Sequence, residues 1–273
     1  MTDLPARPDL DQLRHQARDL LRNVSAGDRT ATGRIRAVSE QMTLAAAQLA
    51  VAREYGFASW PRLKAAVEAR TADLAQKVDA FLEASMRDWT GRVARLLAAT
   101  PEIAGYDFRT AVVLGDADRV REMLRRDPGL ATRTDPRSGW TALDAACASR
   151  WHRLDPARGD GLVAVARLLL DAGADPAARR GGRRGDWTPL RCAVAGAANP
   201  AIARLLLDHG AVPDDHDLYL ACFGDDDHQS LRLLLDHAPD VAQTTALSAP
   251  VNTGDTEAVR LLLRAGASAS RLL

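Results

Sequence analysis

Apolar positions in the second half of the chain recur in a fixed order. Runs of three leucines begin at Leu168, Leu205, Leu233 and Leu261, with spacings of 37, 28 and 28 residues. Around each run the apolar side chains recur at i, i+3 and i+4, which is one stripe of an amphipathic helix, and a short apolar segment precedes each run. The pattern predicts units of two short helices. One such pair cannot bury its own apolar face, whereas stacked pairs can.

Local signals mark where these helices begin and end. Thr188 followed by Pro189 favours a helix start, because Thr caps the first turn and Pro at the first position lacks only an N–H that would be unpaired anyway. Gly173, Gly210 and Gly266 follow three of the leucine runs. A glycine there is typical of a left-handed residue that ends a helix.

These segments resemble the ankyrin repeat. The resemblance rests on TPLRCAVA, which begins at Thr188, and on LLLDAGADP, which begins at Leu168. It implies that residues 77–273 form an all-α, ankyrin-type helical solenoid of about six repeats with short β-hairpin fingers. It also implies a concave face, made of fingers and first helices, that binds other proteins. We expect the repeats at approximately 77–104, 105–135, 136–182, 183–213, 214–241 and 244–273.

Four units depart from the ankyrin pattern at one polar position. The histidine of the family's Thr-Pro-Leu-His segment is replaced by Asp144, Arg191, Tyr219 and Ser248. The hydrogen bonds that this histidine usually makes between repeats are therefore not expected here.

Residues 1–72 predict a separate helical region at the N-terminus. Residues 10–24 have an amphipathic pattern, a second helix follows from Thr43 to Gly56, and Ser59 caps a third. The stretch AREYGFASWPRLK resembles a segment found ahead of ankyrin repeats in bacterial proteins. We expect a cap that covers the first repeat; the alternative is a separate partner-binding helix.

Composition narrows the classes of function. The chain has 36 Lys and Arg against 36 Asp and Glu, which argues against a dedicated nucleic-acid binder. The first residues carry charges throughout and have no apolar region, so no signal peptide is expected; without an apolar stretch of about 18 residues, no membrane-spanning helix is expected either. Its cysteines, Cys147, Cys192 and Cys222, are an odd number without a CxxC pair, which indicates a reducing cytoplasm. We expect Cys147 and Cys222 to be buried.

The motifs of common enzymes and metal sites are missing from the sequence. It contains no nucleophile elbow, phosphate-binding loop or zinc-protease motif. The segment from Asp214 to His228 is rich in Asp and His, but a helix of about eight residues places His216 and His228 ~12 Å apart. One ion cannot bind both. We therefore expect no enzyme activity, no cofactor and no metal site.

A segment rich in Arg and Trp is the main candidate for partner binding. The stretch AARRGGRRGDWTPLR occupies the finger between two units, and Arg and Trp are the residue types that dominate interface hot spots. The alternative is a solvated tip with packing tryptophans. Five arginines on one projecting loop favour an acidic partner surface. The candidate residues are Trp140, Arg179, Arg180, Arg183, Arg184, Trp187 and Arg191.

An insertion supplies a second candidate surface. Residues 149–161 lengthen the turn between two helices of one unit, so that 21 residues separate Cys147 from Leu168. Insertions of this length are commonly functional or disordered. We expect an ordered loop that presents a secondary surface with Trp151, His152 and Arg153.

The sequence as a whole indicates a non-enzymatic protein–protein interaction module, an ankyrin-repeat scaffold or adaptor that binds its partner through the concave finger face. Two alternatives stay open. One is a nucleic-acid- or anion-binding protein that uses the basic finger Arg179–Arg191. The other is a regulatory subunit of an enzyme encoded elsewhere.

Overall fold

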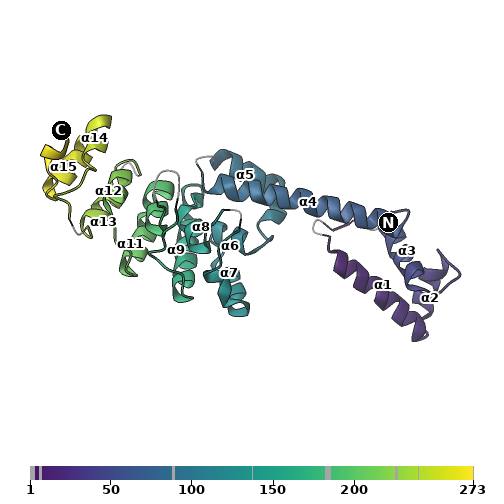
Figure 1. Ribbon diagram of the computed structural model, residues 1–273. Coiled ribbons are helices and arrows are strands. Elements are labelled where there is room, and N and C mark those ends of the chain that lie inside the picture. Colours follow the sequence, from purple (N-terminus) through teal and green to yellow (C-terminus); the bar gives the residue numbers. More distant parts are fainter. Residues whose placement is uncertain are drawn as a thin grey trace. The chain divides into compact units, whose positions relative to one another are not determined.

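The computed structural model describes residues 4–5, 8–87, 90–136, 138–181, 186–224, 227–238 and 240–272. Every regular element within these residues is a helix, as Figure 1 shows, and the predicted all-α class is confirmed. The chain divides into two compact units, Met1–Asp79 and Ala80–Leu273.

The first unit has a small apolar core of its own. Its helices are α1 (Leu10–Ser25), α2 (Arg29–Arg36), α3 (Leu44–Glu54) and α4 (Trp60–Ser85), the last of which continues into the second unit. The side chains of Asp9, Asp28 and Thr43 accept hydrogen bonds from the first turns of α1, α2 and α3, which satisfies N–H groups that have no partner inside the helix. The core includes Leu13, Ala17, Leu20, Ile35, Ala47, Val51 and Leu63.

The predicted helices of this unit are present, but α2 was not predicted. Gly56 has φ +81° just after α3, which agrees with the predicted helix end. In α2 only Ala31 and Ile35 are buried, and the rest of RTATGRIR is polar or glycine. Two apolar side chains in eight residues leave too weak a periodic signal to predict a helix.

The second unit consists of short helices joined by turns. They are α5 (Thr90–Ala99), η1 (Pro101–Ile103), α6 (Phe108–Leu114), α7 (Ala117–Arg126), η2 (Pro128–Ala131), α8 (Ala142–Ala148), η3 (Trp151–Arg153), α9 (Pro156–Asp171), α10 (Pro189–Arg191), η4 (Cys192–Ala197), α11 (Pro200–Asp208), α12 (Asp215–Ala221), α13 (Gln229–Leu235), α14 (Ser248–Thr253), α15 (Thr256–Arg264) and η5 (Ala269–Leu272). Helix α10 runs directly into η4, which is a π-helical turn.

These helices stack in two layers. The first layer contains α6, α8, α10 with η4, α12 and α14, each in contact with the next. The second layer contains α7, α9, α11, α13 and α15 in the same order. Each unit of the sequence pattern therefore contributes one helix to each layer, which is the predicted stacking of helix pairs.

The leucine runs form the core between the layers. The middle leucine of each run is fully buried, and these residues are Leu169, Leu206, Leu234 and Leu262. Burial of a leucine side chain is worth roughly 1.5–3 kcal/mol, so the repeated leucine is a major source of stability. The predicted helix ends are also confirmed, since Gly173, Gly210 and Gly266 all have positive φ.

The cysteines lie in this core as free thiols. Cys147 and Cys222 are buried, as predicted, and so is Cys192. Burial raises the pKa of the Cys222 thiol to about 12 and also raises the pKa of Cys147 and Cys192. A thiol without thiolate character is a poor nucleophile, so these side chains act as small apolar groups.

Two glycines allow the insertion to pack closely on the preceding helix pair, α6 and α7. Asp155 caps α9, Pro156 starts it, and one turn later Gly161 lies against Gly115, which ends α6 with φ +71°. A Cβ atom on Gly161 would lie 2.3 Å from the carbonyl oxygen of Gly115. Only glycine fits this backbone contact.

We predict that Gly161→Ala destabilises the second unit by about 1–3 kcal/mol, because either α9 or the turn at Gly115 must move. The matched control is Gly91→Ala in α5, where the nearest atom to the added Cβ is the end of the Arg95 side chain at 3.6 Å. This change should be neutral or stabilising by up to about 1 kcal/mol, because alanine favours helix. Urea unfolding followed by circular dichroism measures both. Equal stability of the two variants would contradict the close contact.

Candidate functional site

The basic finger is closed at its base by a short antiparallel contact. The N–H of Arg180 donates to the carbonyl of Trp187 at 2.9 Å, and the N–H of Trp187 donates back to the carbonyl of Arg180 at 2.7 Å. The predicted site residues Arg183 and Arg184 lie outside the described residues. This backbone contact places Arg180 opposite Trp187.

Arg180 turns inward from this base. Its guanidinium pairs with the fully buried carboxylate of Asp144 in the first turn of α8, and it lies 5.5 Å from the ring centre of Trp140. The same carboxylate accepts hydrogen bonds from the N–H and the hydroxyl of Thr141, at 2.8 and 2.6 Å. Arg180 is one of the residues predicted to contact a partner, and that role stays a prediction. In the structure a buried carboxylate and an aromatic ring hold its side chain within the stack.

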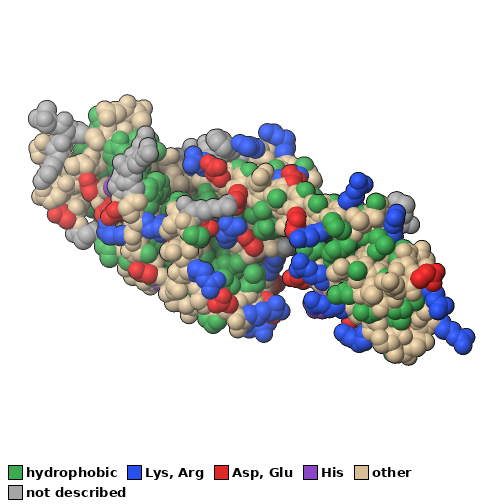
Figure 2. All heavy atoms as spheres, turned by 45° about the vertical axis from the view of Figure 1, so that its right-hand side comes forward, with side chains coloured by type: hydrophobic (Ala, Val, Ile, Leu, Met, Phe, Trp, Pro, Cys, Tyr) green, Lys and Arg blue, Asp and Glu red, His purple; other side chains and the backbone are tan. Residues whose placement is uncertain are grey.

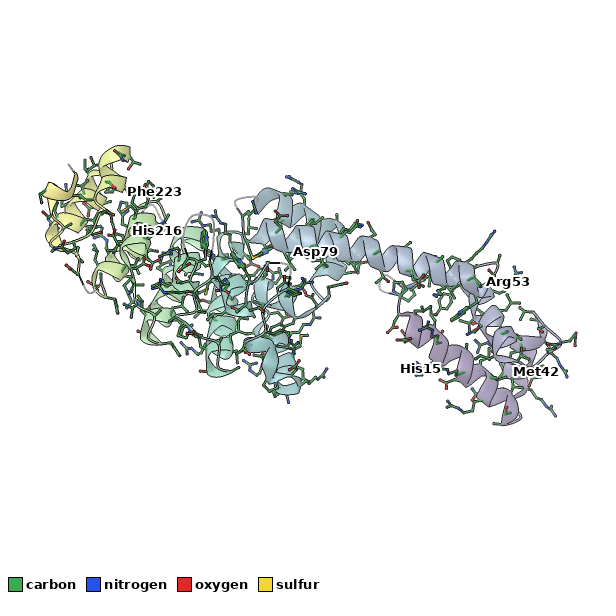
Figure 3. All side chains as sticks on the ribbon, viewed as in Figure 1. His15, Met42, Arg53, Asp79, His216 and Phe223 are labelled. Atoms are coloured by element: carbon green, nitrogen blue, oxygen red, sulfur yellow. The ribbon has the colours of Figure 1, made fainter. Side chains whose placement is uncertain are left out.

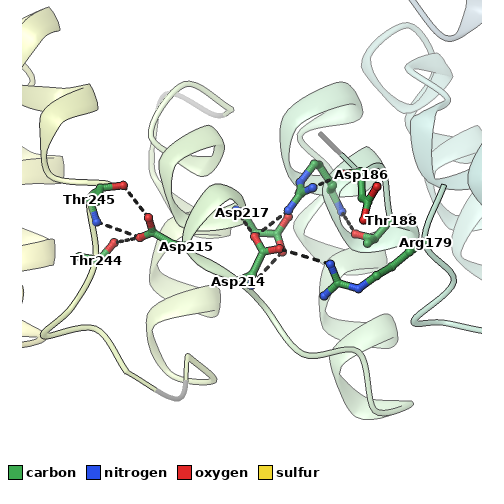
Figure 4. A network of polar contacts seen from close by, with 9 residues as sticks. Arg179, Asp186, Thr188, Asp214, Asp215, Asp217, Thr244 and Thr245 are labelled. Carbon is green, nitrogen blue, oxygen red and sulfur yellow. Dashed lines mark hydrogen bonds and ion pairs between the residues drawn. The ribbon is translucent and has the colours of Figure 1, made fainter. Parts of the chain in front are cut away.

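Arg191 is buried more deeply, with 3% of its surface exposed. Its Nε donates to Asp217 at 2.9 Å, its Nη2 donates to Asp214 at 2.6 Å, and its Nη1 donates to the carbonyl of Asp186. Figure 4 shows these carboxylates beside the end of the finger. Arg191 is also predicted to contact a partner, and that role stays a prediction; in the structure its guanidinium donates to three internal acceptors.

The charges at this junction are mutually dependent. Burial lowers the pKa of Arg191, but the carboxylates of Asp217 and Asp214 outweigh burial and raise it, so the guanidinium stays charged. Burial also raises the pKa of Asp214, yet hydrogen bonds from Arg191 and from the Asp217 N–H hold that pKa below its ordinary value. For Asp217 burial dominates and the pKa is raised. Arg191 is therefore the cation on which the ionised state of Asp217 depends.

The same kind of contact recurs between neighbouring units. Arg109 in α6 pairs with Asp135 at 3.2 Å. On the other side, Asp215 at the start of α12 accepts hydrogen bonds from the hydroxyl of Thr244 and from the N–H and hydroxyl of Thr245 (Figure 4). In each case the first turn of one first-layer helix binds the segment that precedes the next. We name the series the finger seam, and its members are Arg109–Asp135, Asp144–Arg180, Arg191–Asp214–Asp217 and Asp215–Thr244–Thr245.

The finger seam occupies the position where the sequence departs from the ankyrin pattern. Asp144 and Arg191 are two of the four replacements noted above, and each is the third residue of its helix, after the caps Thr141 and Thr188. In the next unit the third residue is Asp217, because Asp214 caps α12. Ion pairs therefore connect the units, and Asp217 rather than Tyr219 takes part in them.

Sequence reasoning missed the carboxylates of the finger seam. Their partners lie 23 to 36 residues away, close to the length of one unit. Oppositely charged residues separated by about one repeat are a signal that could predict these ion pairs. The signal is not apparent within a single repeat, because the two partners belong to neighbouring repeats.

Three of the predicted residues remain accessible at the finger base. The side chain of Arg179 is 58% exposed and lies 4.0 Å from Asp214, while Trp140 and Trp187 are half-buried. On the face of the second unit that is visible in Figure 2, basic and acidic side chains are interspersed. Among the described residues of the predicted site, the accessible ones are thus Arg179 and, in part, Trp140 and Trp187.

The insertion turns its tryptophan inward. Trp151 is 5% exposed, its Nε1 donates to the hydroxyl of Ser85 at 3.1 Å, and its ring lies 5.9 Å from that of Phe81. Arg158 covers the other side at 5.0 Å from the ring centre. In the structure most of the insertion is helical rather than a loop, since residues 151–153 and 156–161 belong to η3 and α9, and the indole of Trp151 fills a gap between helices.

His152 and Arg153 follow Trp151 on the same short helix. Burial lowers the pKa of His152 although the backbone carbonyl of Ser149, 3.3 Å from its Nδ1, favours the charged form. Arg153 is exposed, and its Nη2 donates to the carbonyl of Gly224 at 3.2 Å. The insertion therefore connects distant parts of the stack, and of its three predicted residues Arg153 is exposed, His152 is half-buried and Trp151 is buried.

The described part of the chain was also searched for two other kinds of site. No group of three or more His, Cys, Asp or Glu side chains comes together there in a way that could hold a metal ion. Within the same residues, no helix has both the length and the apolar character needed to cross a membrane.

Comparison with known families agrees with the geometry of the stack. A family model for the ankyrin repeat matches residues 138–180 and 185–217. The matched stretches contain the finger base and the two central junctions of the finger seam. No curated protein matches the chain in sequence. The predicted resemblance is confirmed for the matched residues.

We predict that Arg191→Ala destabilises the second unit by about 3–5 kcal/mol, because it leaves the buried Asp217 carboxylate without its cation. The control is Arg179→Ala, which removes an exposed arginine from the same finger and should cost about 1 kcal/mol or less. Urea unfolding of both variants measures the difference. Similar losses for the two changes would mean that the buried ion pair does not support the stack.

Proposed function

We propose, because this chain contains ankyrin repeats, that it is a non-enzymatic protein–protein interaction module, a scaffold or adaptor. Ankyrin repeats generally act as such modules. The partner binds the finger face, which we define as the finger bases together with the first-layer helices. The observation that carries this proposal is the match to the ankyrin repeat over the residues that form the finger base.

The proposed module has about six repeats. They combine the end of α4 with α5, α6 with α7, α8 with α9, α10 and η4 with α11, α12 with α13, and α14 with α15. Their approximate bounds are those given from the sequence, after an N-terminal helical region at 1–72. The two-layer stacking of helices supports this division. The antiparallel contact between Arg180 and Trp187 supports a β-hairpin finger at that junction.

The accessible residues of the finger base are the proposed contact site. Trp187 and Trp140 offer aromatic surface, and Arg179 offers a positive charge that favours an acidic partner surface. Because the finger seam holds the backbone beneath them, these side chains are fixed before binding, which lowers the entropy lost on association. The anion-binding alternative is weaker, since Arg180 and Arg191 already neutralise internal carboxylates.

Site-specific photocrosslinking tests which face binds. We place benzoylphenylalanine at position 179 or 187 on the finger face, and at the exposed positions Arg167 in α9 or Arg204 in α11 on the second layer. In native lysate, positions 179 and 187 should form one and the same protein adduct, and positions 167 and 204 should not. Adducts from the second layer alone would place the binding surface on the opposite side.

With the crosslinked partner purified, we predict that Trp187→Ala weakens its binding about tenfold, which is roughly 1.4 kcal/mol. Arg179→Glu should mainly lower the association rate, because an exposed charge at the rim acts on encounter. Surface plasmon resonance measures both rates, with circular dichroism as the control for folding. Arg180 is unsuitable for this test, since a glutamate there would face the buried Asp144. Unchanged rates for both variants would exclude the finger base as the contact site.

A further inference from the structure

One cluster of aromatic side chains is unused by the fold and by the finger seam. His216 and Tyr219 lie on α12, and Phe223 lies in the turn directly after it, at spacings of three and four residues. Their rings meet edge to face, with centres 6.3 Å apart for His216 and Tyr219 and 5.5 Å apart for Tyr219 and Phe223. We name these three residues the aromatic ridge, and Figure 3 marks both of its ends.

The aromatic ridge lies on the side of α12 that does not form the core. His216 is exposed, Tyr219 is half-buried, and Phe223 is 52% exposed. Leu218 and Ala221 on the other side of the helix are buried. The rings therefore contribute little to packing, although an exposed phenylalanine leaves a large apolar area in water.

The finger seam holds the aromatic ridge in place from both directions. Asp214, the cap of α12, and Asp217 bind Arg191 of the preceding unit, and Asp215 binds Thr244 and Thr245 of the following one. Helix α12 therefore cannot rotate about its axis without breaking these contacts. A row of rings with a fixed orientation is suited to binding, because little order must be gained on association.

The sequence around the aromatic ridge is acidic. Residues 214–228, which contain the ridge, include six Asp and no Lys or Arg. Asp227 is exposed shortly after the end of α12, while the arginines on the finger side, Arg179 and Arg191, face carboxylates. Arg153 is the cation seen at the other end, where it binds the carbonyl of Gly224. Aromatic faces carry negative electrostatic potential and attract guanidinium and ammonium groups, so rings and carboxylates act in the same sense.

We infer that the aromatic ridge binds a basic segment of a partner protein, with Arg or Lys side chains stacked on Tyr219 and Phe223. This inference rests on the proposed function as an interaction module and specifies the chemistry of one contact. It adds a cation-binding patch on α12 to the finger base, where Arg179 favours acidic groups. A partner with a basic segment beside an acidic one would be oriented along the stack by the two patches.

Fluorescence anisotropy with a labelled peptide of five Arg-Gly repeats tests the inference on the full chain. The wild-type protein should bind this peptide, and a peptide of five Glu-Gly repeats should not bind. Phe223→Ala should raise the dissociation constant at least fivefold, which is on the order of one cation–π contact. Phe223→Leu should cause a similar loss, because leucine keeps the apolar surface but removes the ring.

Leu263→Ala is the matched control. Leu263 is an apolar side chain of α15 with 46% exposure, similar to that of Phe223, and it lies in the second layer. Its replacement should leave the dissociation constant within about twofold, since it lies outside the aromatic ridge. Circular dichroism shows that each variant is folded.

Three outcomes would overturn the inference. They are binding of Phe223→Leu as tight as that of the wild type, equal effects of Phe223→Ala and Leu263→Ala, and a failure of the Arg-Gly peptide to bind. The proposed function is judged separately by the crosslinks from positions 179 and 187. If those crosslinks form while the peptide does not bind, the interaction module stands and the basic partner segment does not.

Discussion

The ion pairs of Arg191 with Asp217 and Asp214 are the contact on which the centre of the repeat stack depends. Removal of a guanidinium and a carboxylate from water costs several kcal/mol for each ion, and only close, well-aligned partners offset that cost. Arg191 meets both carboxylates and a carbonyl within hydrogen-bonding distance, so the cost is offset only in one arrangement of the two units. A helix pair shifted along its neighbour would leave a buried charge without a partner. Apolar packing drives the stacking, and this ion pair determines how the units are aligned.

The same alignment explains which residues are left for binding. Arginine is a residue type typical of interfaces, but Arg180 and Arg191 form ion pairs with carboxylates of neighbouring repeats and so hold the repeats together. Arg179 is exposed and the tryptophans at the finger base are half-buried, so these side chains stay accessible. Within this short segment, Arg180 and Arg191 therefore stabilise the stack, and Arg179 is available for the proposed binding. Substitutions in this segment have to be interpreted with stability measured alongside binding.

The parts of the fold that could be predicted from the sequence are the local and periodic ones. Leucine runs at i, i+3 and i+4 define the second-layer helices, and glycines after them mark their ends, because each signal lies within a few residues. The inward turn of Arg180 could not be predicted in this way, since its partner Asp144 lies 36 residues earlier on another helix. Trp151 is a clearer case: its hydrogen-bond partner Ser85 is 66 residues away, and only the packed unit brings the two together. For the candidate site, the sequence predicts the position of a basic finger, whereas the direction of its side chains depends on contacts between repeats that no local signal carries.

In a repeat protein, the charge that a surface presents therefore depends on ion pairs between neighbouring repeats as well as on the residues of its own segment. The finger from Arg179 to Arg191 is strongly basic when it is read alone, yet the next unit supplies Asp214 and Asp217 to its end and the preceding unit supplies Asp144 to its base. A partner contacts the side chains that remain after these internal ion pairs have formed. Among the described residues of the finger base that remainder is Arg179, and on and just after α12 it is a row of rings within an acidic part of the chain. A neutral total charge is therefore compatible with the two binding surfaces proposed above, one for acidic and one for basic groups.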